Sequence, residues 1–100
     1  MDRFATRRDK AIKAASKAGL DALLVTNFAN VTYLTGFTGD DSYLLLAGKH
    51  PILISDPRYT TQLSEECPDI ELSIRVPGTP ILDDVPRTVR TAKAKKVGIE

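Results

Sequence analysis

The chain has 100 residues and a net charge of +1, and 42% of its residues are hydrophobic. This length allows one globular domain, and the near-neutral charge argues against a nucleic-acid partner. No apolar run approaches the ~18 residues of a membrane span, and the charged N-terminus lacks the apolar segment of a secretion signal. The single cysteine, Cys67, excludes an internal disulfide and fits a reducing compartment. We therefore expect a cytoplasmic domain that binds neither nucleic acid nor membrane.

Residues 2–18 carry alanines and other apolar residues near helical spacing, which predicts a helix that Gly19 ends. The apolar residues 20–25 predict a buried strand covered on both faces. Asn27 is the expected cap of a short helix over residues 28–34. The outer face of the first helix is basic and is expected to be a solvated surface, made by Arg3, Arg7, Arg8, Lys10, Lys13 and Lys17.

Residues 43–47 and 52–55 flank a turn signal of glycine, lysine, histidine and proline, which predicts a β-hairpin. A helix is expected next, with Asp56 as its cap and Pro57 at its first position. Residues 70–76 alternate between apolar and polar side chains, which indicates a strand near the edge of a sheet.

The last third of the chain predicts a helix up to about residue 94 and a strand that begins at residue 97. Pro86 is expected to kink or delay this helix, and Val85 and Val89 are expected to face inward. Helices interleaved with apolar strands predict an α/β fold, a mixed β-sheet with helices on both faces. A chain that stops at the start of a strand suggests the N-terminal fragment of a longer protein.

Residues able to support catalysis are few. The single histidine, His50, stands in a predicted turn, and with one cysteine it cannot build a zinc site of usual composition. No nucleophile elbow and no glycine-rich nucleotide loop is present. Two acidic pairs, Asp40–Asp41 and Asp83–Asp84, could hold a divalent ion. The first pair could equally be a solvated loop tip, and the second suits the positive end of a helix. We therefore expect no catalytic centre in this chain.

Three short stretches and their spacing carry a family resemblance. Gly19-Leu20-Asp21-Ala22 follows the basic helix, Y-L-T-G-F fills residues 33–37, and D-P-R-Y fills residues 56–59. In this order they resemble the N-terminal domain of the creatinase/prolidase/aminopeptidase P family, across essentially the whole chain. The resemblance implies a ribonuclease-H-like fold for residues 1–100, truncated at the C-terminal end of the domain. It also implies a larger C-terminal catalytic "pita-bread" domain with two divalent metal ions, manganese, cobalt or zinc, whose ligands lie outside this chain.

The family resemblance implies a proline-specific metallopeptidase, an Xaa-Pro dipeptidase or aminopeptidase that acts on proline-containing peptides. The N-terminal domain would be non-catalytic, would form homodimer or higher homo-oligomer contacts, and would supply part of a substrate pocket shared with the partner subunit. The expected substrate-side residues are Asn30, Phe37, Asp40 and Asp41. Phe37 could form the wall of a proline-sized pocket, and either aspartate could pair with the free amino group of a substrate.

The remaining motif residues are expected to be structural. Tyr33 is expected to anchor the base of the loop in the core, and the same placement is an open alternative for Phe37. Gly36 would supply backbone angles closed to other residues. Tyr59 would pack inward, and Arg58 would pair with a nearby carboxylate or with carbonyl groups.

Two other functions stay open at this point. Catalytically inactive relatives of the family bind proteins such as histones, which would make the chain a protein-binding module. A creatinase-like amidinohydrolase is the other alternative. A following domain that carries two aspartates, one histidine and two glutamates in the metal pattern would decide for the peptidase.

Overall fold

The computed structural model describes residues 3–38, 42–47, 50–55, 57–67, 70–74, 85–86, 88–90 and 95–99. Its elements are, in chain order, α1 (Arg3–Lys17), β1 (Ala22–Val25), α2 (Phe28–Thr35), β2 (Tyr43–Ala47), β3 (His50–Ser55), the 3-10 turn η1 (Pro57–Tyr59), α3 (Thr60–Glu66), β4 (Glu71–Ile74) and β5 (Val97–Ile99). Residues 85–86 and 88–90 are also helical.

The strands form one five-stranded mixed sheet in the order β4-β3-β2-β1-β5. The central strand β2 runs antiparallel to β1 and β3, whereas β5 is parallel to β1 and β4 is parallel to β3. The predicted hairpin is confirmed, since Ala47 of β2 pairs with His50 of β3. His50 is therefore the first residue of a strand, where the sequence had suggested the turn. The edge position expected from the alternating pattern of β4 is confirmed as well.

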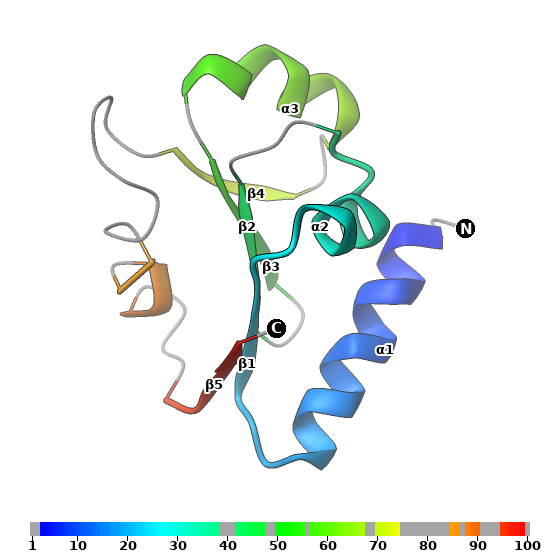
Figure 1. The fold of residues 1–100 in the computed structure, drawn as a ribbon, viewed down its shortest axis with the longest axis vertical. Coiled ribbons are helices and arrows are strands. Elements are labelled where there is room, and N and C mark those ends of the chain that lie inside the picture. The colour runs from blue at the N-terminus through cyan, green and yellow to red at the C-terminus, as the bar shows by residue number, and fades with distance from the viewer. Residues whose placement is uncertain are drawn as a thin grey trace.

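Helices cover both faces of the sheet, as predicted. Figure 1 shows α1 and α2 on one side of the strands and the short helical piece around residues 85–90 on the other. Alternate residues of β2 separate the two faces: Leu44 and Leu46 pack with α2 and α3 in one core cluster, and Leu45 packs on the opposite side. Val85 and Val89 contact that second cluster, which confirms their inward orientation.

The helix that follows β3 begins differently from the prediction. The chain first makes the turn η1, and α3 starts only at Thr60 with no side-chain cap at Tyr59. The predictions that concern Asp56, and those for Asp40, Asp41 and the pair Asp83–Asp84, lie outside the described residues.

The basic outer face predicted for α1 is wrong at one position. Arg8 is 8% exposed, and its Nη1 donates a hydrogen bond of 2.8 Å to the carbonyl oxygen of Leu34. The reason is that α2 packs on α1, so the Arg8 side chain lies between the two helices. Its guanidinium group reaches the C-terminal end of α2, where the last backbone carbonyls have no partner within the helix. A sequence pattern does not show which residue of a basic helix a later helix will cover.

Candidate functional site

The helix α2 is fixed at its first turn by a side-chain cap. The Oδ1 atom of Asn27 accepts hydrogen bonds from the backbone N–H groups of Ala29 and Asn30, at 2.9 and 3.3 Å. The capping role predicted for Asn27 is therefore confirmed. The cap sets where α2 begins and so which of its side chains turn toward α1.

The C-terminal end of α2 has a partner for each of its last carbonyl groups, which no later turn of the helix could supply. The N–H of Gly36 bonds to the carbonyl of Thr32, and Cys67 Sγ lies 3.4 Å from the carbonyl of Thr35. The two carbonyls between them accept from arginines of α1: Arg7 Nη1 bonds to Tyr33 at 2.9 Å, and Arg8 Nη1 bonds to Leu34. Cations suit this position because the C-terminus is the negative end of the helix dipole.

Gly36 ends α2 in the left-handed conformation, with φ of 81°. The ring of Phe4 packs against it so closely that a Cβ atom on Gly36 would lie 2.9 Å from two ring carbons. The backbone angle therefore favours glycine here, as expected for the end of this helix, and the ring of Phe4 would have to shift to admit a Cβ atom.

Phe37, the next residue, lies in the core. Its side chain is 0% exposed, and its ring meets that of Tyr59 edge to face with centroids 5.6 Å apart. Its carbonyl accepts from Thr32 Oγ1, and its N–H donates to Thr35 Oγ1. The Y-L-T-G-F and D-P-R-Y motifs therefore contact each other. Of the two placements considered for Phe37, the structure has the core position.

Tyr33 is not in the core, so that expectation is wrong. Its side chain is 55% exposed, and the guanidinium carbon of Arg7 lies 4.0 Å from the ring centroid. The ring lies on the surface between α2 and α1 because a cation–π contact can hold an aromatic ring there without burial.

Residues 39–41 are bordered on both sides by tethered residues. Thr38 donates to Glu66 Oε1 from its N–H at 2.9 Å and from its hydroxyl at 3.2 Å, and Gln62 Nε2 donates to the Thr38 hydroxyl. The hydrogen bond from the Thr38 N–H lowers the pKa of Glu66 below its ordinary value. On the other side, the buried hydroxyls of Ser42 and Ser55 are 2.8 Å apart. Asp40 and Asp41 lie outside the described residues, between these two anchors.

A surface pocket of about 270 Å³ lies between α1 and α2 and is lined by several polar side chains. Asn30, one of the residues predicted for the site, lines it beside Tyr33. The other lining residues are Thr6, Arg7, Lys10, Ala11 and Leu34. Sequence reasoning missed Arg7 and Lys10 as members of a site, although their spacing along α1 places them on one face.

Arg58 and Cys67 differ in exposure, and the predicted pairing of Arg58 stays a prediction. Arg58 is exposed, and its guanidinium carbon is 5.3 Å from the centroid of the Tyr59 ring. Burial raises the pKa of the Cys67 thiol, which disfavours a reactive thiolate.

The described residues contain no group of three His, Cys, Asp or Glu side chains that could hold a metal ion. The metal ions implied by the family resemblance therefore do not fit this part of the chain. Among the described helices, none combines the length and the apolar character that a membrane crossing requires.

The mixed sheet with helices on both faces makes the chain an α/β domain (Figure 1). The profile of the Creatinase/Prolidase N-terminal domain family matches residues 7–100. The chain belongs to this family.

Individual relatives agree with the family match. The chain is 32% identical over 82 residues to the "Uncharacterized peptidase YqhT" of Bacillus subtilis, covering 82% of this chain and 23% of that protein. The N-terminal domain of the cytoplasmic peptidase PepQ from Mycobacterium tuberculosis has a TM-score of 0.85 and 33% identity, over 95% of this chain and 72% of that one. An Xaa-Pro dipeptidase from Bacillus anthracis has a TM-score of 0.83 and 29% identity, over 96% of this chain and 27% of that one. The chain thus spans about a quarter of the length of the two longer relatives.

Proposed function

We propose that this chain is the non-catalytic N-terminal domain of a metal-dependent Xaa-Pro peptidase, a dipeptidase or an aminopeptidase. In this proposal it supplies homo-oligomer contacts and part of a substrate pocket shared with the partner subunit. The observation that carries the proposal is the match of residues 7–100 to the Creatinase/Prolidase N-terminal domain family. The substrate-side segment is proposed to be residues 39–41, whose neighbours in the chain, Thr38 and Ser42, are bound to Glu66 and Ser55. Loops that a rigid domain holds in place commonly carry binding residues.

Asp40 and Asp41 are the proposed substrate-side residues of this segment. A carboxylate shielded from water pairs strongly with an ammonium group, so it can select peptides that have a free amino terminus. Asn30 is proposed as a second polar contact, from the surface pocket that it lines on α2. Phe37, which packs against Tyr59 in the core, is proposed to fix the chain just before residues 39–41.

The catalytic residues belong to a C-terminal domain in this proposal. That domain would hold two divalent ions, manganese, cobalt or zinc, and would cleave proline-containing peptides in the cytoplasm. The likeness to PepQ, which is described as a cytoplasmic peptidase, supports both the activity and the location. The 100-residue chain alone is expected to show no turnover of Xaa-Pro peptides with added manganese. Turnover that purifies with the chain would overturn this assignment.

The test of the aspartates uses the full-length enzyme. Asp40→Asn and Asp41→Asn are expected to raise KM for a peptide with a free amino terminus by about tenfold, the loss of one charge-assisted bond. The same peptide with an acetylated amino terminus, measured as a competitive inhibitor, should keep its inhibition constant. Asp9→Asn on the outer side of α1 is the matched control. Equal weakening of both peptides would remove the role in amine recognition.

A further inference from the structure

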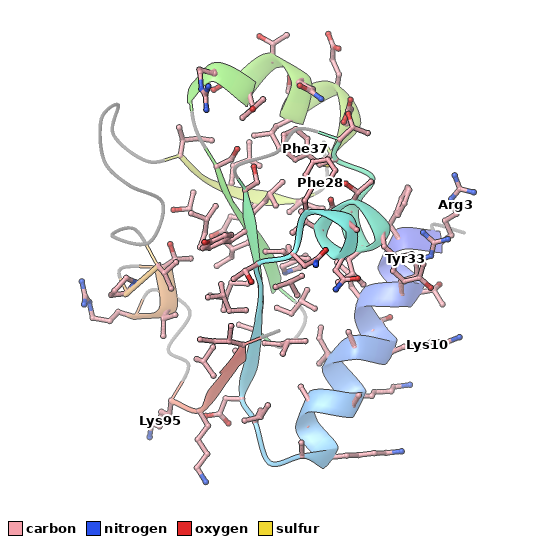
Figure 2. The ribbon with its side chains drawn as sticks, viewed as in Figure 1. Arg3, Lys10, Phe28, Tyr33, Phe37 and Lys95 are labelled. Atoms are coloured by element: carbon pink, nitrogen blue, oxygen red, sulfur yellow. The ribbon has the colours of Figure 1, made fainter. Side chains whose placement is uncertain are left out.

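The helix α1 concentrates positive charge that the whole chain does not have. It carries six basic residues and one acid, in a chain whose net charge is only +1. Figure 2 shows Arg3, Tyr33 and Lys10 one after another along the outer side of α1. The guanidinium carbon of Arg3 lies 5.2 Å from the Phe4 ring centroid, and that of Arg7 lies 5.4 Å from the same centroid. The end of α1 that contacts α2 is therefore a surface of cations and aromatic rings.

The pocket in this surface has a composition that suits a carboxylate. Its lining includes the cations of Arg7 and Lys10, the polar groups of Thr6, Asn30 and Tyr33, and no acidic residue. Arg7 uses one donor on the carbonyl of Tyr33, and a guanidinium has five in total. Ala11 and Leu34 add an apolar part to the wall.

The dimensions favour one side chain over a larger ligand. The pocket volume of about 270 Å³ is below the roughly 300–1,000 Å³ that encloses a drug-sized ligand or cofactor. Nucleic acid fits less well, because binding to phosphates uses an extended basic surface and a clear excess of positive charge. Arginine and tyrosine are the residue types that dominate binding energy at protein interfaces.

We propose that the α1–α2 pocket docks an acidic segment of a partner polypeptide. A glutamate or aspartate side chain enters between Arg7 and Lys10, and a neighbouring apolar residue packs on the exposed ring of Tyr33. The proposal shares with the proposed function only Asn30, which lines this pocket, and it rests on Arg7, Lys10 and Tyr33. It does not depend on the peptidase assignment.

The test measures the anisotropy of a short fluorescein-labelled peptide of glutamates around one leucine, titrated with the full-length protein. The full-length protein is used because the match covers only 72% of the PepQ N-terminal domain that was crystallised as a separate chain. Lys10→Glu and Tyr33→Ala are each expected to weaken binding by about tenfold. Lys17→Glu makes the same change of charge at the other end of α1 and should alter binding by less than about twofold. Circular dichroism checks that each variant is folded.

Four results would overturn the proposal. The first is that the unchanged chain fails to bind the peptide. The second is that Lys10→Glu and Lys17→Glu weaken binding equally, since binding would then follow only the general charge of the helix. The third is that a glutamine version of the peptide, or a single-stranded oligonucleotide, binds at least as tightly. The fourth is a concentration-dependent dimer that Lys10→Glu dissociates, because a second copy of the chain would then be the occupant.

Discussion

Arg8 and Leu34 are 26 residues apart and are joined by a buried hydrogen bond of 2.8 Å, from the Arg8 Nη1 to the Leu34 carbonyl oxygen. A buried charge is costly unless it is paired, and here the negative end of the α2 dipole and a carbonyl group compensate it. The bond therefore fixes the position of α2, and of the segment after it, relative to α1.

Arg8→Met should lower the free energy of unfolding by about 1.5–3 kcal/mol, because it removes a hydrogen bond from a charged donor and leaves a buried carbonyl without a partner. Urea denaturation measures the change. Lys13→Met on the exposed side of α1 is the control and should stay within about 0.5 kcal/mol. A loss for Arg8→Met no larger than for the control would contradict the role of this bond.

Phe37→Ala should lower the free energy of unfolding by about 3–5 kcal/mol, as expected for a buried phenylalanine. Tyr33→Ala changes a side chain that is 55% exposed and should cost less than about 1 kcal/mol. Thermal melts of the two variants give the comparison. Similar losses for both would contradict the opposite placements of the two rings.

Gly36→Ala should destabilise more than Gly19→Ala. Both glycines have positive φ, 81° and 83°, so alanine is strained at either position by about 1–2 kcal/mol. A Cβ on Gly19 meets nothing within 4 Å, whereas one on Gly36 meets the Phe4 ring at 2.9 Å. In a Phe4→Leu background, Gly36→Ala and Gly19→Ala should lower the free energy of unfolding by similar amounts. If Gly36→Ala still costs more there, the contact with the Phe4 ring is not the cause.

Asp21→Ala should loosen β5 from the sheet. The Asp21 Oδ2 accepts from the backbone N–H groups of Lys95 and Lys96, at 3.2 and 3.1 Å, just before β5 begins. Hydrogen exchange of the β5 amides should become faster, since each lost bond contributes about 0.5–1.5 kcal/mol. Asp9→Ala is the control on α1. Unchanged exchange in β5 would show that the parallel pairing with β1 holds the strand without the hydrogen bonds of Asp21.

The hydrogen bonds between Thr38 and Glu66 should depend on pH. Because the pKa of Glu66 is lower in the folded chain, its stabilising effect is complete above the unfolded pKa of about 4.3 and is lost as the pH falls through the folded value. The chemical shift of the Thr38 amide should therefore titrate with a midpoint below about 4.3. The stability difference from Glu66→Gln should be present at neutral pH and vanish in acid. A midpoint at or above the ordinary value would contradict the hydrogen bond from the Thr38 N–H to Glu66.

The sequence predicted the elements whose signals are local. Asn27 and Gly36 mark the two ends of α2 through a side-chain acceptor and a left-handed angle, and both act within a few residues of the chain. The strands β2 and β3 follow from apolar runs around a turn. Their order in the sheet agrees with the α/β class that alternating helices and strands predict.

The candidate site was less predictable because it depends on where two helices cross. Arg7 and Arg8 are neighbours with the same chemistry, yet Arg8 is buried and Arg7 lies over the exposed ring of Tyr33. Only the packing of α1 on α2 separates them. The same packing brings Asn30 and Lys10 to one pocket. The roles of Asp40 and Asp41 stay predictions.

The pairing of β1 has a consequence for biosynthesis. Ala22 pairs with Ala47 on one side and with Val97 on the other, so one edge of β1 can pair early and the other only after Val97 has left the ribosome. Until then a leucine-rich strand keeps an open edge, the kind of surface that attracts other strands. Nascent chains that pause before Val97 should therefore be the species that most need a chaperone.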